Sequence, residues 1–314
     1  MKKVIVLLGP TGVGKTGASV LLAMQLNTEI ISADSMQVYR YMDIGTAKPS
    51  EQERCGVRHH MIDIVDPSEP YSTGRYICEV EPVIEGLLKK GKIPLIVGGT
   101  GLYIKAMTRG MFSGPSSDLE LRDRLLAMEQ EERGSLYDYL RKIDPQTAEK
   151  IEKNNIRRII RAIEVCAASG STLSELQREL TRPLPYEFIK IGLTRDRKEL
   201  YHMIDLRVDA MFHAGLVEEV EKILGTNPDR TPLQAIGYKE VIPYLNHEAD
   251  LEETVRLVKR NSRRYAKRQF TWFRQEEGIQ WVDVTGLSES KDIAARIRRR
   301  LKDSSFAYHK FESA

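Results

Sequence analysis

The stretch VIVLLGPTGVGKT, residues 4–16, decides the fold of this chain. Its five leading apolar residues predict a buried strand, and the GPTGVGKT portion fits the phosphate-binding loop that joins a strand to a helix. Gly12 and Gly14 let the backbone curl so that successive N–H groups face an anion. Lys15 adds a full positive charge, and the Thr16 hydroxyl can bind a magnesium ion that shares the phosphate oxygens. The stretch therefore predicts an anion site at the first strand of an α/β core.

The composition is that of an ordinary globular protein. The 314 residues are 41% hydrophobic and 30% charged, with a net charge of only +3. The three cysteines, Cys55, Cys78 and Cys166, are odd in number and far apart, which argues against a disulfide framework and a zinc site. The adjacent His59 and His60 have no third ligand at a matching spacing, so a metal site there is disfavoured. No apolar run reaches the length of an export signal or a membrane span, and we expect a cytoplasmic protein.

Strand-like and helical patterns alternate over residues 1–110, which predicts a parallel sheet covered by helices on both faces. After the first strand we expect strands at 29–35 and 93–99, and helices near 17–26 and 76–90. Residues 118–180 show only helical patterns, with helix starts at 144–145 and 154–155 and a helix end at 169–170. A strand pattern returns at 188–193, and another occurs at 279–284. We therefore expect an α/β core, residues 1–112 and 186–314, interrupted by an all-helical insertion domain, residues 113–185.

One acidic residue that a nucleotide hydrolase needs is missing. Such an enzyme usually has a second strand that ends in Asp, which holds the magnesium shell. The natural candidate strand, residues 93–97, is followed by Gly98, Gly99 and Thr100. The strand at 29–35 does carry an acid, Asp34, where ligands bind in open α/β sheets. Asp34 is either a turn or cap residue, or a general base or magnesium ligand.

Basic residues are concentrated in two places. Residues 255–274, VRLVKRNSRRYAKRQFTWFR, hold eight Lys and Arg residues and no acid, with four aromatic residues among them. On a helix, one face would carry Val255, Val258, Ser262, Tyr265 and Gln269, and another would carry Arg256, Arg260, Arg263, Lys267 and Arg274. A second cluster is Arg157, Arg158 and Arg161 in the predicted insertion. Both clusters fit nucleic-acid phosphates with aromatic stacking on bases, although a solvated helix face is the alternative.

With these residues identified, the chain closely resembles the bacterial tRNA dimethylallyltransferases, the IPP transferase family. The matching stretches follow the family's order over nearly the whole chain: GPTGVGKT (9–16), ISADSMQVYRYMDIGTAKP (31–49), HHMIDIVDP (59–67), PLIVGGTGLYIKA (94–106), RRIIRAIEV (157–165), LYHMIDLRVDAMFHAGLVEEV (200–220), QAIGYKEV (234–241) and YAKRQFTWFR (265–274). The resemblance implies a P-loop NTPase-like α/β core with a helical insertion that contacts tRNA. It implies transfer of a dimethylallyl group from its diphosphate to the exocyclic amine of the adenine just 3′ of the tRNA anticodon.

The resemblance also implies roles for individual residues. Asp34 matches the family's base, Thr100 its hydroxyl beside the amine, and Arg207 its diphosphate-binding arginine. The residues implied to bind diphosphate are Gly9, Thr11, Gly12, Val13, Gly14, Lys15, Thr16 and Arg207, with Mg²⁺ as cofactor at Thr16. The residues implied to contact the tRNA anticodon stem-loop are Asp34, Ser35, Met36, Gln37, Thr100, Arg122, Arg157, Arg158, Arg161, Gln234, Gly237, Tyr238, Lys239, Arg263, Lys267, Arg268, Trp272 and Arg274. The eukaryotic zinc finger is absent, since no cysteine follows Cys166. A monomer suffices, because tRNA can bridge core and insertion.

Three rival functions remain open from the sequence. A nucleotide kinase would use the loop for ATP, but it would lack the acid after residues 93–97 and would leave the basic helix without a purpose. A prenyltransferase for free AMP or ADP would leave the insertion without one. A non-catalytic RNA-binding protein would not explain a phosphate loop beside Asp34 and Thr100.

Overall fold

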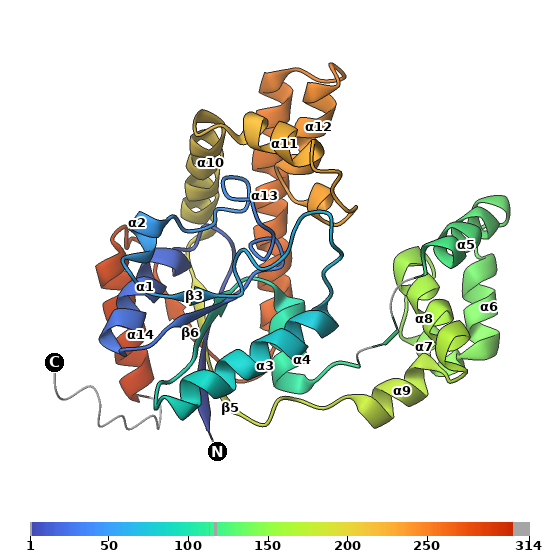
Figure 1. The fold of residues 1–314 in the computed structure, drawn as a ribbon, viewed down its shortest axis with the longest axis horizontal. Helices are drawn as coiled ribbons and strands as arrows, with labels where there is room; N and C mark the ends of the chain where they lie inside the picture. Colours follow the sequence, from blue (N-terminus) through green and yellow to red (C-terminus); the bar gives the residue numbers. More distant parts are fainter. Residues whose placement is uncertain (1, 113, 116–117, 304–314) are drawn as a thin grey trace. The chain divides into compact units, whose positions relative to one another are not determined.

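The computed structural model describes residues 2–112, 114–115 and 118–303, and its centre is a parallel sheet of six strands (Figure 1). The strand order is β3-β2-β4-β1-β5-β6. The strands are β1 (Lys3–Leu8), β2 (Ile30–Ala33), β3 (His59–His60), β4 (Leu95–Gly98), β5 (Glu187–Thr194) and β6 (Ile279–Asp283). All pairings are parallel. The predicted parallel sheet is therefore confirmed, and the first, glycine-loop strand lies between β4 and β5.

The sequences of β1, β2 and β4 agree with their burial and length in the sheet. Val4–Leu8 of β1 are completely buried, as expected for an inner parallel strand covered on both faces. β2 and β4 are shorter than the predicted strands at 29–35 and 93–99, because Asp34 already begins a turn and Gly99 leaves the sheet. The carboxyl ends of β1, β2 and β4 therefore meet at one edge of the sheet.

Ten helical segments complete the sheet-containing part of the described chain. They are α1 (Lys15–Gln25), α2 (Glu51–Arg54), α3 (Thr73–Lys89), α4 (Gly101–Arg109), α10 (Arg197–His213), α11 (Leu216–Leu224), the 3₁₀ turn η1 (Pro232–Gln234), α12 (Tyr238–Leu245), α13 (Leu251–Arg274) and α14 (Ser290–Asp303). The main core packs β1 and β5 against α1 and α14. A second apolar cluster joins residues of the 36–48 segment to α11 and α12. No helix in the described ranges is long and apolar enough to cross a membrane.

Residues 106–184 form a separate compact unit, and the rest of the chain forms the other. Beyond the end of α4, this unit contains α5 (Leu119–Glu131), α6 (Ser135–Ile143), α7 (Pro145–Glu149), α8 (Ile156–Ser169) and α9 (Leu173–Leu180). Its helices begin and end where the sequence predicts: Asp144 and Asn155 cap α7 and α8 through their side chains, and Gly170 ends α8 with a left-handed φ of 69°. The predicted absence of strands is confirmed for the described residues of this unit.

Candidate functional site

The phosphate-binding loop runs from β1 into α1 and is left-handed at two glycines. Gly12 has φ +80° and Gly14 has φ +102°, conformations that a side chain disfavours. A Cβ at Gly12 would also lie 2.8 Å from the Ile204 side chain of α10. Gly14 precedes the first residue of α1, so the free N–H groups of this helix start face the loop. The loop thus has the backbone geometry of an anion site.

Two cations lie at this loop, and no carboxylate of the described residues is bound to either. The Lys15 Nζ donates to the carbonyl oxygens of Gly9 and Pro10, at 2.9 and 2.8 Å. Burial lowers the pKa of Lys15 from 10.5 to about 7, Asp34 opposes this shift and Arg207 adds to it. The Arg207 Nη2 donates to Thr11 Oγ1 at 2.5 Å, while its buried Nε has no partner among the described residues. Burial also lowers the pKa of Arg207. An anion bound here would give both cations a partner of opposite charge and so favour their charged forms.

Gln269, on α13, is far from the phosphate-binding loop in the sequence but binds it directly in the structure. Its Oε1 accepts the backbone N–H of Thr11 at 2.9 Å, across 258 residues, and its Nε2 donates to the Gly99 carbonyl at 2.8 Å. The residue is buried. From the sequence, Gln269 is expected on one face of a helix, but nothing there predicts a role for it. The only available signal is that an uncharged polar residue stands in the buried stripe of an amphipathic helix.

Asp34 directly follows β2, and its carboxylate is oriented by a turn. Its Oδ1 accepts the backbone N–H groups of Met36 at 2.9 Å and Gln37 at 3.3 Å. No hydrogen bond to its Oδ2 is found among the described residues. Thr100, after β4, accepts the N–H of Ser35 through Oγ1 at 3.0 Å. The structure therefore places Thr100 against the turn that begins at Asp34, and no acid directly follows β4.

Asp34 shares one cavity of about 330 Å³ with the phosphate-binding loop, Arg207 and Gln269. Its lining combines the phosphate-binding loop, the strand ends, residues of the 36–48 segment and residues of three distant helices, α10, α13 and α14: Thr11, Gly12, Gly14, Lys15, Thr16, Gly17, Asp34, Gln37, Thr46, Ala47, Val97, Gly98, Gly99, Met203, Arg207, Tyr265, Gln269 and Ser290. Burial, together with the nearby Asp34 carboxylate, raises the pKa of the Tyr265 phenol, which lines the same cavity. Phosphate-binding groups and a carboxylate thus line one cavity.

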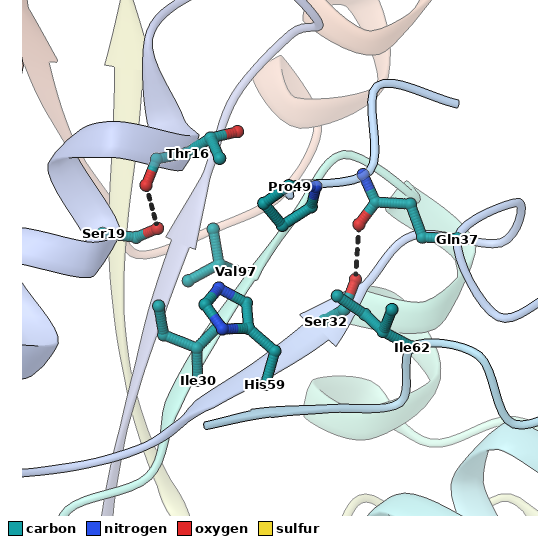
Figure 2. Close-up of a pocket in the computed structure, with 9 residues that line it drawn as sticks. All are labelled: Thr16, Ser19, Ile30, Ser32, Gln37, Pro49, His59, Ile62 and Val97. Carbon is teal, nitrogen blue, oxygen red and sulfur yellow. Dashed lines mark hydrogen bonds between the residues drawn. The ribbon is translucent and has the colours of Figure 1, made fainter. Parts of the chain in front are cut away.

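A smaller cavity of about 30 Å³ lies next to Thr16 (Figure 2). This volume is large enough for a water molecule that would bridge the polar groups around it. It is lined by Thr16, Ser19, Ile30, Ser32, Gln37, Pro49, His59, Ile62 and Val97. Ser32 donates to the Gln37 Oε1 at 3.2 Å, and His59 is held by the Val57 carbonyl at 2.9 Å. In the described chain, no group of three or more His, Cys, Asp or Glu residues is placed to hold a metal ion.

Several basic side chains of α13 form ion pairs with acidic residues, which the sequence of the helix does not indicate. Arg263 pairs with Asp205 at 2.5 Å, Lys259 with Asp209 at 2.6 Å and Arg256 with Glu253. The buried stripe contains Thr254, Val258, Ser262, Ala266, Gln269 and Phe273. Val255 and Tyr265, which the periodicity places in that stripe, are only partly buried. Lys267, Arg268 and Arg274 are exposed, and Arg268 lies over the Tyr265 ring. Arg264 is exposed as well, so the exposed positive charge is concentrated in the C-terminal half of the helix.

Other residues implied to contact tRNA differ in exposure. Gln234 and Lys239 are exposed, but Gly237 is buried and the Tyr238 ring is completely buried, with its hydroxyl bonded to Glu219. A side-chain contact of Tyr238 with RNA is therefore wrong for this structure, because the ring belongs to the α11–α12 core. Trp272 is partly buried against Gly101, where a Cβ would lie 2.3 Å from the indole.

Within the helical unit, two of the predicted arginines have an internal partner. Arg122 donates twice to the buried Glu164, at 3.0 Å each, and Arg161 donates to the same carboxylate at 2.7 Å. Burial alone would raise the pKa of Glu164, but the hydrogen bonds from Arg122 and Arg161 lower it below its usual value. Arg157 and Arg158 are exposed at the start of α8. Arg122 therefore holds α5 to α8, while Arg161 pairs with the same carboxylate from within α8 and also donates to the Pro115 carbonyl. Arg157 and Arg158 are the exposed basic residues of that cluster.

Comparison with known proteins is consistent along the whole chain. The family model described as IPP transferase matches residues 37–276, and the one described as Isopentenyl transferase matches residues 2–66. A tRNA dimethylallyltransferase of Thermodesulfovibrio yellowstonii is 52% identical over 309 residues, covering 96% of this chain and 98% of its own. One of Alkaliphilus oremlandii is 45% identical, with 96% and 97% covered.

Solved structures agree with these relatives. The tRNA isopentenylpyrophosphate transferase of Bacillus halodurans is similar with a TM-score of 0.71 and 42% identity, covering 98% of this chain and all of its own. A eukaryotic dimethylallyltransferase, described as acting on tRNA, has a TM-score of 0.81 and 33% identity, with 98% and 80% covered.

Proposed function

The chain belongs to the IPP transferase family, and from that premise we propose how its cavity performs prenyl transfer. The chain is a tRNA dimethylallyltransferase. We propose that the acceptor is the exocyclic amine of the adenine on the 3′ side of the anticodon and that the donor is dimethylallyl diphosphate. One observation carries this proposal: Asp34 shares a cavity with Lys15 and Arg207 and lies close enough to influence the pKa of both.

On the donor side, the cavity offers positive charge where the leaving group would develop negative charge. Breaking the bond between the allylic carbon and oxygen leaves both bonding electrons on diphosphate. The loop N–H groups, Lys15 and Arg207 would stabilise that charge, and fixed donors do so without reorganising. Because Lys15 is buried with a pKa of about 7, a bound diphosphate would favour its charged form.

Mg²⁺ would fit the loop through Thr16, which lines the cavity and whose hydroxyl has no hydrogen-bond partner among the described residues. Since no cluster of acidic or histidine side chains is placed to bind a metal in the described chain, diphosphate oxygens would supply most of the remaining ligands. When bound, Mg²⁺ would neutralise charge on the leaving diphosphate.

On the acceptor side, Asp34 would take a proton from the amine as the new carbon–nitrogen bond forms. The amine is a poor nucleophile because its lone pair is delocalised into the adenine ring. Asp34 Oδ1 is held by two backbone N–H groups, so Oδ2 is the oxygen left to accept this proton. Thr100, fixed against Ser35, would align the amine. The products are prenylated adenine, diphosphate and a proton held by Asp34.

The adenine must leave the anticodon-loop stack to enter this cavity, as in other enzymes that modify a base. The exposed Lys267, Arg268 and Arg274 would contact RNA phosphates, as would Arg157 and Arg158 of the helical unit. A tRNA substrate also supports a cytoplasmic location. Kinase activity and prenylation of AMP or ADP are disfavoured, since the relatives are named for transfer to tRNA.

Incubation of the purified protein with labelled dimethylallyl diphosphate tests the proposal, in parallel reactions with unmodified tRNA and with AMP. We expect label in tRNA alone, at the adenine 3′ of the anticodon. A tRNA with another base at that position is the matched control and should stay unlabelled. Label in AMP alone, or in neither acceptor, would refute the proposal.

A further inference from the structure

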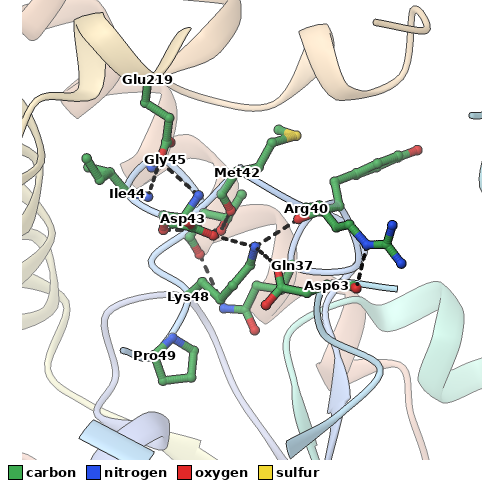
Figure 3. A network of polar contacts seen from close by, with 12 residues as sticks. Gln37, Arg40, Met42, Asp43, Ile44, Gly45, Lys48, Pro49, Asp63 and Glu219 are labelled. Atoms are coloured by element: carbon green, nitrogen blue, oxygen red, sulfur yellow. Dashed lines mark hydrogen bonds and ion pairs between the residues drawn. The ribbon is translucent and has the colours of Figure 1, made fainter. Parts of the chain in front are cut away.

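A buried carboxylate holds the loop that forms one wall of the cavity (Figure 3). Glu219, on α11, accepts three consecutive backbone N–H groups of this loop. Its Oε2 binds the nitrogens of Asp43 and Ile44 at 2.9 and 2.7 Å, and its Oε1 binds that of Gly45 at 2.9 Å. The Tyr238 hydroxyl donates to the same Oε1. Four donors thus converge on one side chain that is 8% exposed.

The fit around Gly45 leaves no room for a side chain at this position. A Cβ at Gly45 would lie 2.4 Å from the Tyr238 ring and 2.9 Å from Leu216. Real Cβ atoms do not approach so closely, so the loop backbone lies directly against α11 and α12.

The other side of the loop is fixed by two further side chains. The buried Lys48 ammonium pairs with Asp43 and Asp63, each at 2.5 Å, and donates to the Tyr39 carbonyl. The Gln37 amide donates to the carbonyls of Thr46 and Ala47, at 3.3 and 3.2 Å. Residues 42–48, which we call the wall loop, are therefore held by Glu219 of α11, by Gln37, and by the loop's own Lys48, which ties it to Asp63 and Tyr39.

These contacts form a continuous path from α11 to Asp34. Thr46 and Ala47 of the wall loop line the cavity, and their carbonyls fix the Gln37 side chain. The Gln37 backbone N–H is in turn one of the two donors to Asp34 Oδ1. Any displacement of the wall loop would therefore change the turn that orients Asp34.

Stability alone does not account for a buried carboxylate at this place. Charged groups are costly to bury, and apolar packing can replace them without loss of stability. What a carboxylate provides is a fixed geometry for several N–H groups at once. We propose that Glu219, assisted by Tyr238, is a positioning residue that sets the wall loop and, through Gln37, the direction of the Asp34 carboxylate. This inference rests on the proposed function of Asp34.

The decisive variant is Glu219→Gln, compared with Glu218→Gln, which makes the same change at the exposed neighbouring position. Glutamine presents one NH₂ group to the four donors, so it cannot satisfy them all. In Glu219→Gln we expect faster hydrogen exchange of the Asp43–Gly45 amides. We also expect single-turnover prenyl transfer at saturating substrates to slow by about 10–100-fold, the usual cost of a small misplacement at a catalytic group. The affinities for dimethylallyl diphosphate and for tRNA should stay within about threefold of wild type, a difference under 1 kcal/mol.

Tyr238→Phe removes only one donor and keeps the ring, so it should fold and show a smaller change in the same direction. Unchanged amide exchange, or a transfer rate equal to that of Glu218→Gln, would overturn the inference. A fall in both affinities that matches the fall in rate would also overturn it, since that pattern indicates general damage. If wild type transfers no prenyl group, the proposed function itself fails. Hydrogen exchange would then report separately whether Glu219 holds the wall loop.

Discussion

Replacing Gln269 with Met should weaken the phosphate-binding loop while preserving the packing of α13. Methionine has a similar length and shape but can neither accept the Thr11 N–H nor donate to the Gly99 carbonyl. The Gly99 carbonyl would lose a buried partner, which costs about 1–3 kcal/mol, whereas the Thr11 N–H faces the cavity and can bind water, at about 1 kcal/mol. The expected loss of unfolding free energy is about 2–4 kcal/mol.

For a chain of 314 residues this loss corresponds to a fall in melting temperature of roughly 4–8 °C. If loop order contributes about 1.4 kcal/mol to anion binding, the affinity for inorganic diphosphate with Mg²⁺ should fall about tenfold. Thermal unfolding and calorimetric titration measure the two effects. Gln177→Met makes the same change at an exposed position of α9 and should alter neither. Wild-type diphosphate affinity in Gln269→Met would refute the argument that this side chain shapes the loop.

The remaining predictions concern the base, the RNA surface and acid stability. Asp34→Asn keeps an oxygen for the turn but removes the base, so the rate of prenyl transfer should fall by about 10²–10⁴-fold. The affinity for tRNA, measured by filter binding, should stay unchanged. An equal loss of tRNA affinity would indicate a folding role for Asp34. Changing Lys267 and Arg268 to Gln should weaken tRNA binding and reduce its salt slope by about one unit per lost phosphate contact, and an unchanged slope would exclude those contacts. Hydrogen bonds, first from Lys92, lower the pKa of Glu29 from 4.5 to about 2. Glu29→Gln should therefore cost about 1–2 kcal/mol at pH 7, and in denaturant unfolding the difference should vanish as the pH falls from about 4.5 to 2.

The local parts of this fold are predictable from the sequence because their signals lie within a few residues of each other. The glycine loop, the caps at Asp144 and Asn155 and the left-handed Gly170 each depend on neighbours in the chain. The end of β4 without an acid is equally visible in the sequence. What these signals share is that the interacting groups are brought together by local geometry alone.

The contacts that organise the cavity are not predictable in this way. Gln269 meets Thr11 across 258 residues, and Glu219 meets the Asp43 amide across 176. The free charge of α13 cannot be predicted from its sequence either, because Arg263 is neutralised by Asp205 of another helix, α10. Only the packing of α10, α11 and α13 decides which polar side chains face the cavity and which charges stay free.

Asp34 shows how a structural role and a chemical role can reside in one side chain. The sequence offers a turn cap and a base as alternatives, but the carboxylate has two oxygens, and the turn uses only Oδ1. Fixing Oδ1 restricts rotation of the carboxylate, which gives Oδ2 a defined direction in the cavity. A free carboxylate would lose this orientation to rotamer exchange. The cap is therefore a condition for the proposed base, and the wall loop that supports the cap belongs to the same catalytic arrangement.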